Sequence, residues 1–434
     1  MKWKKLTAAV LIGTSFAMAG DFVYDKKISA EVLQVENILS VTGVAEVYGD
    51  GEKISCAILE YPKKINPKNL YATDFGVEGK ILSAVYVNDK PEITNKSKAG
   101  RYVILKFANV NTAFDGNLNQ KPDRPKNNSA RAGDAPMRSN RTLSNLNFTV
   151  KQLNTITAVD GTEFLPSEKA VTKISAPEIE KFQQFTYTDP ATGNSMPYNL
   201  YLPKNYNPNK KYPLLFFVAD ASANINEVTT PLFQGNGATS FLDKDCIILA
   251  PQYTADLVDK LGMMTTDENI WTDGLTLITN LLFDVIKNYS VDENRIYGTG
   301  QSQGGMTNIA ISDKYPDLFA AQLLVACQWN VDEMEILKNK NLWIVVCEGD
   351  TKAFPAMNDA VARWEKLGAK VARNKNFWNS KLPVSELNKQ VKNLERQHAN
   401  INYTVFAGGN HMYTWSFAYN IDALRDWLFK QKKF

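Results

Sequence analysis

The sequence contains few of the residues that usually build metal sites or disulfide frameworks. Its 434 residues include two histidines and four cysteines. Zinc sites need several histidines or paired cysteines, and disulfide-dense folds need more cysteines for their length. The composition therefore argues against a metal centre and against a small fold held by disulfides. A chain of this length suggests two or three domains with ample residues for a large core.

The chain also lacks a large charge of one sign and a long apolar segment. The formal net charge is +3, and three of the basic residues, Lys2, Lys4 and Lys5, lie at the N-terminus. Without them, 46 basic and 46 acidic residues remain. This balance predicts no general affinity for nucleic acid or for an anionic membrane surface. No later run is apolar enough to cross a membrane.

The N-terminal residues have the pattern of a secretory signal peptide. After the three lysines come a mostly apolar stretch at residues 6–16 and the A-x-A cleavage site Ala17-Met18-Ala19. The stretch is too short for a lasting membrane anchor. Residues 1–19 are therefore predicted to be removed, so that Gly20 begins a secreted protein, extracellular or periplasmic.

Two regions with different patterns follow. Residues 25–171 contain short alternating segments separated by turn residues, which predicts an all-β sandwich of immunoglobulin type. Within it, residues 115–146 are rich in Asn, Arg, Pro and Ser, which predicts a flexible insertion. Residues 175–434 alternate strand-like and helix-like segments, which predicts an α/β domain with a mainly parallel sheet covered on both faces.

Individual elements of the α/β region can be predicted from its pattern. Strands are expected at residues 342–347 and 402–406, and helices at residues 273–288, 303–314 and 417–431.

The four cysteines are predicted to be buried free thiols: Cys56, Cys246, Cys327 and Cys347. Cys327 and Cys347 end predicted strands that can be neighbours, so a disulfide between them remains an alternative.

The most informative stretch is Gly300-Gln301-Ser302-Gln303-Gly304, which lies between a strand-like run and a helical segment. A strand, a sharp turn and a helix are the setting of a G-x-S-x-G nucleophile elbow. A Cβ on either flanking glycine would clash with the neighbouring backbone. Ser302 is therefore the predicted nucleophile, and the backbone N–H of Gln303, at the helix N-terminus, is the predicted oxyanion donor.

A serine hydroxyl needs a base, and only two histidines are available. His411 follows Gly408-Gly409-Asn410 on a loop after the last predicted strand, and is the predicted base. His398 lies at the polar end of a predicted helix, where a solvated or helix-capping role suits it.

The acid should lie between Ser302 and His411, because hydrolases of this kind order their triad as serine, acid, histidine. Asp350 follows the predicted strand at residues 342–347 and is the preferred candidate. Glu348 is the alternative, since it lies only two residues away. Asp359 is a weaker candidate because it falls inside the next helix.

Residues 175–434 resemble the α/β-hydrolase esterases related to polyhydroxybutyrate depolymerases and feruloyl esterases, and more distantly the prolyl oligopeptidase-like peptidases. The resemblance rests on residues 291–305, on residues 315–319, and on Gly409-Asn410-His411 with Thr414-Trp415. Residues 25–171 resemble, more loosely, the immunoglobulin-like module that precedes the catalytic domain in some bacterial extracellular esterases. That match rests on residues 74–79 and 100–104.

The chain departs from these esterases in the loop that supplies the second oxyanion N–H. They commonly carry His-Gly there, whereas this chain has Ala219-Asp220-Ala221-Ser222. The backbone of Ala221 or Asp220 can still donate, but an aspartate would repel an oxyanion unless it is turned away or paired. The acid motif also differs, with Cys347 and Glu348 where His-Gly is usual, which keeps Glu348 open.

The resemblance implies a serine esterase that works through an acyl-enzyme, needs no cofactor or metal, and acts on a small-molecule or oligosaccharide ester. Aromatic and amide side chains expected near the site are candidate substrate contacts: Trp271, Gln328, Trp329, Phe354 and Trp415. Secretion favours an esterified polysaccharide or oligosaccharide. Two alternatives stay open, a prolyl oligopeptidase-like serine peptidase and a non-catalytic carbohydrate- or surface-binding protein on a hydrolase fold.

Overall fold

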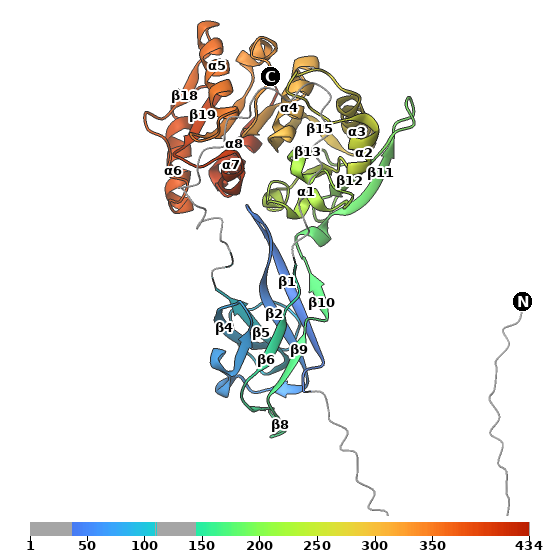
Figure 1. Ribbon diagram of the computed structural model, residues 1–434, viewed down its shortest axis with the longest axis vertical. Coiled ribbons are helices and arrows are strands. Elements are labelled where there is room, and N and C mark those ends of the chain that lie inside the picture. The colour runs from blue at the N-terminus through green and yellow to red at the C-terminus, as the bar shows by residue number, and fades with distance from the viewer. Residues whose placement is uncertain (1–36, 109, 111–144, 434) are drawn as a thin grey trace, which may run out of the picture. The chain divides into compact units, whose positions relative to one another are not determined.

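The computed structural model describes residues 37–108, 110 and 145–433, and Figure 1 labels their helices and strands. The predicted signal peptide at residues 1–19 lies outside the described residues. Residues 115–144 of the predicted insertion lie outside them as well.

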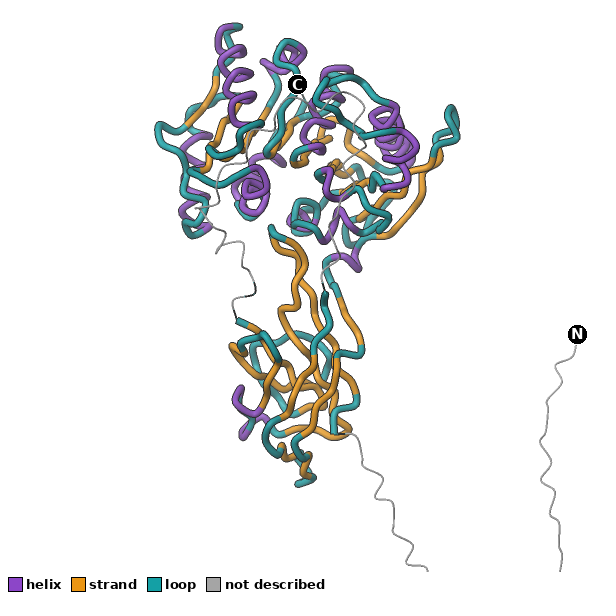
Figure 2. The backbone as a smooth tube through the Cα atoms, viewed as in Figure 1, coloured by secondary structure: helices purple, strands orange, loops and turns teal. Residues whose placement is uncertain are grey.

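The N-terminal part of the described chain is all-β. Its larger sheet has the strand order β10-β1-β2-β5-β4, and a smaller sheet has the order β3-β6-β9. Almost only strands and loops occur in this region (Figure 2). The strands are β1 (Ser40–Tyr48), β2 (Gly51–Ile65), β3 (Phe75–Val77), β4 (Leu82–Asn88), β5 (Gly100–Phe107), β6 (Thr149–Gln152), β7 (Ile156–Thr157), β8 (Glu163–Phe164), β9 (Ser167–Ala170) and β10 (Lys173–Ser175).

One apolar cluster fills the space between these two sheets. Val41, Leu59 and Val103 point into it from the larger sheet, and Phe75 and Val150 from the smaller one. Apolar side chains from both inner faces hold the sheets together, as in a β-sandwich. The prediction of an all-β, immunoglobulin-like N-terminal domain is thereby confirmed.

The C-terminal part is built on a nine-stranded sheet of order β11-β12-β14-β13-β15-β16-β17-β19-β18. The pairs β11–β12 and β12–β14 are antiparallel, and all the others are parallel. Its strands are β11 (Gln183–Thr188), β12 (Ser195–Tyr201), β13 (Tyr212–Val218), β14 (Ile247–Pro251), β15 (Val291–Gln301), β16 (Ala321–Val325), β17 (Leu342–Cys347), β18 (Val371–Arg373) and β19 (Ile401–Phe406).

Helices follow most of these strands along the chain (Figure 1). They are α1 (Thr230–Phe233), α2 (Ala255–Leu261), α3 (Asp273–Asn288), α4 (Gln303–Lys314), α5 (Ala353–Lys366), α6 (Val384–Glu395), α7 (His411–Ala418) and α8 (Asp422–Lys430). Short 3-10 turns complete the region, among them η5 (Ala221–Ala223) and η7 (Glu333–Asn339).

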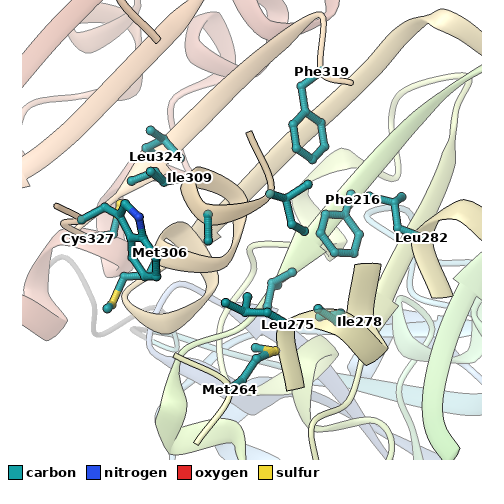
Figure 3. Close-up of a cluster of buried hydrophobic side chains, with 14 of the residues drawn as sticks. Phe216, Met264, Leu275, Ile278, Leu282, Met306, Ile309, Phe319, Leu324 and Cys327 are labelled. Carbon is teal, nitrogen blue, oxygen red and sulfur yellow. The ribbon is translucent and has the colours of Figure 1, made fainter. Parts of the chain in front are cut away.

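Each face of the large sheet has its own apolar core. Leu214 and Phe216 of β13 point to one core, which contains side chains of α3, α4 and α5. Figure 3 shows part of this core, with Phe216 and residues of α3 and α4 labelled. Leu215 and Phe217, the alternate residues of the same strand, point to the other core, with side chains of α6, α7 and α8. Strands buried on both faces explain the nearly continuous apolar runs in the sequence. The predicted α/β class is therefore confirmed.

Two details of the structure bear on the sequence predictions. All four cysteines are buried free thiols, so the alternative of a Cys327–Cys347 disulfide is wrong for this structure. The helix predicted over residues 417–431 is in fact two helices, α7 and α8, which meet near Asn420. Among the residues described, no helix combines the length and apolar character that spanning a membrane requires.

An isolated carboxylate lies at the far end of α4. Neither side-chain oxygen of Asp313 has a hydrogen-bond partner, while the neighbouring Trp329 N–H donates to Glu333 at 2.7 Å. Burial, and then the negative charge of Glu333, raise the pKa of Asp313 to about 7, against a smaller lowering by the nearby Trp329 N–H. Since burial disfavours the charged form, the folded protein holds a proton on Asp313 between about pH 4 and pH 7 that the unfolded chain releases.

Asp313→Asn should stabilise the protein more at pH 8 than at pH 5. The folded-state pKa lies above the unfolded value, so Asp313 lowers stability progressively as the pH rises from about 4 to about 7, by at most about 4 kcal/mol. Asparagine removes that loss. Urea unfolding at both pH values measures it, with Asp317→Asn, an exposed carboxylate paired with Lys340, as the control. Equal effects of Asp313→Asn at the two pH values would contradict the assignment.

Candidate active site

Ser302 occupies a strained turn between β15 and α4. Its φ of 52° and ψ of −120° lie in a region that residues with a side chain rarely adopt. The Ser302 N–H donates to the carbonyl oxygen of Val325 on β16 at 3.0 Å, which ties the turn to the sheet. Tertiary contacts therefore hold Ser302 at the carboxyl end of the central strand.

The glycines of the motif let this turn approach β13. A Cβ on Gly300 would lie 2.5 Å from the carbonyl oxygen of Val218, and one on Gly304 would overlap the same oxygen. A Cβ on Gly305 would overlap the sulfur of Cys327. Packing of backbone and side chains around Ser302 thus requires glycine at these three positions.

His411 reaches the site from the start of α7. The structure makes it the first residue of that helix, whereas the sequence predicted a loop. The side chain of Asn410 caps the helix by accepting from the Tyr413 N–H at 2.9 Å. The cap fixes the direction in which the helix starts and so the position of the imidazole.

Ser302, His411 and Asp350 lie in one hydrogen-bonded series. The distance from His411 Nε2 to Ser302 Oγ is 2.9 Å, and that from His411 Nδ1 to Asp350 Oδ2 is 2.6 Å. Because a carboxylate can only accept, the proton is on Nδ1, and Nε2 is left to accept from the serine hydroxyl. This is the tautomer in which a histidine can take the serine proton.

Asp350 is 1 % exposed yet fully partnered. Its second oxygen, Oδ1, accepts from the backbone N–H groups of Lys352 and Ala353 at 3.0 and 2.9 Å. Burial by itself would raise the pKa of Asp350, but His411 and these two N–H groups outweigh it and hold the pKa below its usual range. Asp350 is therefore an anion beside the imidazole.

The two weaker candidates lie elsewhere. Glu348 accepts from the Gly408 N–H at 2.9 Å and so braces the chain that leads to His411, without being the carboxylate at the ring. His398 is exposed just beyond the end of α6, with a φ of 49°. It lies beyond the C-cap residue Arg396 and is exposed, which agrees with a solvated role.

Two of the five candidate substrate contacts are core residues. Trp329 is 5 % exposed and Trp415 is 6 % exposed. The Trp415 ring meets the His411 ring edge to face, with centroids 5.1 Å apart at 81°. Packing against the imidazole restricts its rotation, so the structure places Trp415 as support for His411.

The other three candidates are partly exposed and do not share one place. Trp271, with Trp329, lines a cavity of about 460 Å³. Phe354, four residues after Asp350, lines a different cavity of about 200 Å³. Gln328 approaches the sulfur of Met306, one turn along α4 from Ser302.

Two backbone donors flank the nucleophile. Gln303 is the first residue of α4, so its N–H points out of the helix N-terminus beside Ser302. After β13 the chain turns into η5, whose first residue is Ala221 and whose cap is Asp220. The N–H groups of Ser222 and Ala223 are occupied by the side chain and backbone oxygens of Asp220. Ala221 and Asp220 are the donors left in this loop.

The mainly parallel sheet, with helices on both faces and a strained serine between the central strand and the next helix, defines an α/β-hydrolase. A family model described as "Putative esterase" matches residues 190–423, more than half of the chain. The chain therefore belongs to this esterase family and is a hydrolase of esters. A second model, described as "Esterase Ig-like N-terminal domain", matches residues 40–165.

Several solved structures are similar to the chain. A thermostable esterase is 23% identical, with 91% of this chain and 100% of that chain covered and a TM-score of 0.69. A ferulic acid esterase is 13% identical, with coverages of 58% and 98% and a TM-score of 0.40. The feruloyl esterase module from Clostridium thermocellum, an S954A mutant complexed with sinapinate, is 15% identical, with coverages of 57% and 88% and a TM-score of 0.35. No curated protein matches the sequence.

Within residues 37–108, 110 and 145–433, no group of three or more His, Cys, Asp or Glu side chains is arranged to hold a metal ion.

Gly304→Ala should disrupt the site and the fold around it. The new methyl group would overlap the carbonyl oxygen of Val218, which is backbone and cannot rotate away. Overpacking of this kind costs roughly 1–3 kcal/mol, and more where backbone must move. The melting temperature and the rate of ester hydrolysis should both fall. An unchanged melting temperature would show that β13 and α4 can separate without loss.

Proposed function

We propose that the protein is a secreted serine esterase that cleaves carboxylic esters through Ser302, His411 and Asp350. The observation that carries the proposal is the hydrogen-bonded series from Ser302 Oγ through His411 to Asp350, with distances of 2.9 and 2.6 Å. The esterase family match supports the class of bond cleaved. It favours an ester over a peptide as the substrate. The intact series argues against a purely binding role.

The first half of the proposed reaction forms an acyl-enzyme. Ser302 Oγ attacks the ester carbonyl carbon while His411 Nε2 takes the hydroxyl proton. The carbonyl oxygen becomes an oxyanion that accepts from the Gln303 N–H and from Ala221 or Asp220 in the facing loop. The intermediate collapses, His411 gives its proton to the departing alkoxide, and an alcohol leaves. Asp350 stabilises the imidazolium throughout.

The second half repeats these steps with water. His411 takes a proton from water, the resulting hydroxide attacks the acyl carbon, and the oxyanion forms again in the same place. Collapse breaks the bond to Ser302 Oγ, which recovers its proton from His411, and a carboxylic acid is released. Every proton is carried by His411, so the scheme needs no cofactor or metal.

We further propose an esterified polysaccharide or oligosaccharide as the substrate class. Support comes from the signal-peptide pattern at residues 1–19, which predicts export to where such polymers occur. Gln328, beside Met306 one turn along α4 from Ser302, and Phe354, four residues after Asp350, are the proposed substrate contacts, because aromatic and amide groups suit sugar rings and phenolic acids.

Ser302→Ala should abolish hydrolysis of short acyl nitrophenyl esters, because it removes the hydroxyl that lies 2.9 Å from His411 Nε2. The expected loss of kcat is about 10³-fold or more. Wild type should also react with a fluorophosphonate probe, and the variant should not. Ester hydrolysis that survives in a folded Ser302→Ala protein would overturn the proposal. Cleavage of prolyl peptides without esterase activity would favour the peptidase alternative.

Asp350→Asn and Glu348→Gln are a matched pair that separates the two candidate acids. Asparagine at position 350 cannot accept from Nδ1–H as an anion and favours the wrong tautomer, so kcat should fall by about 10⁴-fold. Glu348→Gln keeps an oxygen that can accept from Gly408 N–H, so kcat should change by less than about 10-fold. Steady-state kinetics on one nitrophenyl ester measures both. A larger loss from Glu348→Gln would reverse the assignment.

A further inference from the structure

Buried amide side chains lie on both sides of Ser302 and contact the loop that faces it. These are Gln301 and Gln303, the two variable positions of the G-x-S-x-G motif, and each is under 5 % exposed. The loop is residues 220–224, which leave β13 through Asp220 and include η5. The two contacts join segments about 80 residues apart in sequence.

Gln303 and Asn224 form a reciprocal amide pair. Asn224 Nδ2 donates to Gln303 Oε1 at 3.3 Å, and Gln303 Nε2 donates to Asn224 Oδ1 at 3.2 Å. Both side chains are buried. A buried amide that loses its partner costs about 1–3 kcal/mol, so the pair resists separation of the loop from the start of α4.

Gln301 makes the corresponding contact on the other side of Ser302. Its Nε2 donates to Asp220 Oδ2 at 3.3 Å, and its Oε1 accepts from the hydroxyl of Tyr419 at 3.4 Å. Asp220 Oδ1 is held by the N–H of Ser222 at 2.8 Å and by the Ser222 hydroxyl. Asp220, whose negative charge would repel an oxyanion if it were unpaired, is therefore paired through both carboxylate oxygens.

A third amide fixes the far end of the loop. Gln252, which follows β14, donates through Nε2 to the carbonyl oxygens of Ala223 and Ile225 at 2.8 and 2.6 Å. At the near end, Gly304 packs against the backbone of Val218. The loop is thus restrained at its start, at its middle and at its end.

We propose that Gln301, Gln303 and Asn224 are positioning residues that hold the 220–224 loop so that its donor N–H, that of Ala221 or Asp220, and the Gln303 N–H converge on one oxyanion. The inference rests on the proposed function, since it concerns the oxyanion formed at Ser302. Three observations support it. The N–H groups of Ser222 and Ala223 are already hydrogen-bonded, and the Asp220 carboxylate is paired. The Gln303 side chain hydrogen-bonds Asn224 in the same loop that supplies the second oxyanion donor. The role belongs to the side chains, while the donors are backbone groups.

A loop held in this way stabilises the transition state more than the bound ester, because an oxyanion is more sensitive to donor position than a neutral carbonyl oxygen. Loss of the amide pair should therefore lower kcat with little change in KM. A purely structural role would instead lower the melting temperature and leave the kinetics of the folded protein intact.

The test uses three variants of the full-length protein. Asn224→Leu leaves Gln303 without a partner, and should lower both the melting temperature and kcat. The double variant Asn224→Leu with Gln303→Met replaces both amides by apolar groups of similar size, and should recover much of the melting temperature but not kcat. The swap Asn224→Gln with Gln303→Asn restores an amide pair of the same combined length, and should recover kcat.

The expected loss for the single and the double variant is about 10- to 100-fold in kcat, with KM within about 3-fold of wild type. A trifluoromethyl ketone, which forms a tetrahedral adduct with an anionic oxygen, reports the oxyanion site directly. Its inhibition constant should rise by the same factor as kcat falls. Gln322→Met is the control, because Gln322 is a buried amide that bonds Ser312 and the Asn308 backbone away from the loop. It should lower the melting temperature and leave both kinetic readouts unchanged.

The outcomes separate this inference from the proposed function. If Ser302→Ala abolishes hydrolysis while the Asn224 and Gln303 variants keep wild-type kcat and ketone affinity, the esterase proposal stands and the positioning role is wrong. If kcat simply follows the melting temperature across the single, double and swapped variants, the positioning role is also wrong. If Ser302→Ala retains activity, the proposed function itself fails, whatever the loop variants show.

Discussion

The close contact between the β15–α4 turn and β13 is the constraint on which the rest of the site depends. Gly304 has no room for a Cβ beside the carbonyl oxygen of Val218, and Ser302 is held at a φ of 52°. Such a backbone conformation costs about 1–3 kcal/mol, which the packing of a sheet with two apolar cores offsets. The strained turn holds Ser302 between the strand and the helix, where its hydroxyl can reach a base from another part of the chain.

The buried charge of Asp350 orients the base that serves Ser302. Asp350 is a buried anion, and burial of a charge is tolerated only where it is paired and hydrogen-bonded. Its partners are the His411 ring on one oxygen and two N–H groups at the start of α5 on the other. The same contacts that keep Asp350 ionised also orient the imidazole. Trp415 then closes the space beside the ring, so His411 is restrained both by polar contacts and by packing.

The parts of the fold that sequence could predict are those with a strong local period. The helices at α3 (Asp273–Asn288) and α4 (Gln303–Lys314) and the strand β17 (Leu342–Cys347) have the predicted bounds. The helix α7 (His411–Ala418) was missed because it is buried on nearly all sides and has no polar stripe, and because Gly408-Gly409 before it reads as loop. The amide contacts of Gln301 and Gln303 could not be predicted at all, since they join segments whose proximity only the folded sheet creates.

The loop at residues 219–222 departs from the motif of related esterases, and its contacts explain how the departure is tolerated. Where related esterases carry His-Gly, Asp220 brings a charge that by itself would oppose an oxyanion. The structure compensates with Ser222 on one carboxylate oxygen and Gln301 on the other. In the positioning scheme, Asp220 of the loop and Gln301 of the elbow act together, because Gln301 holds the loop by pairing with the Asp220 carboxylate. Replacing Gln301 with an apolar residue while keeping Asp220 would leave one oxygen of the Asp220 carboxylate without its partner. The loop would then be more stable with that carboxylate turned toward water, and this movement would take the loop N–H away from the oxyanion.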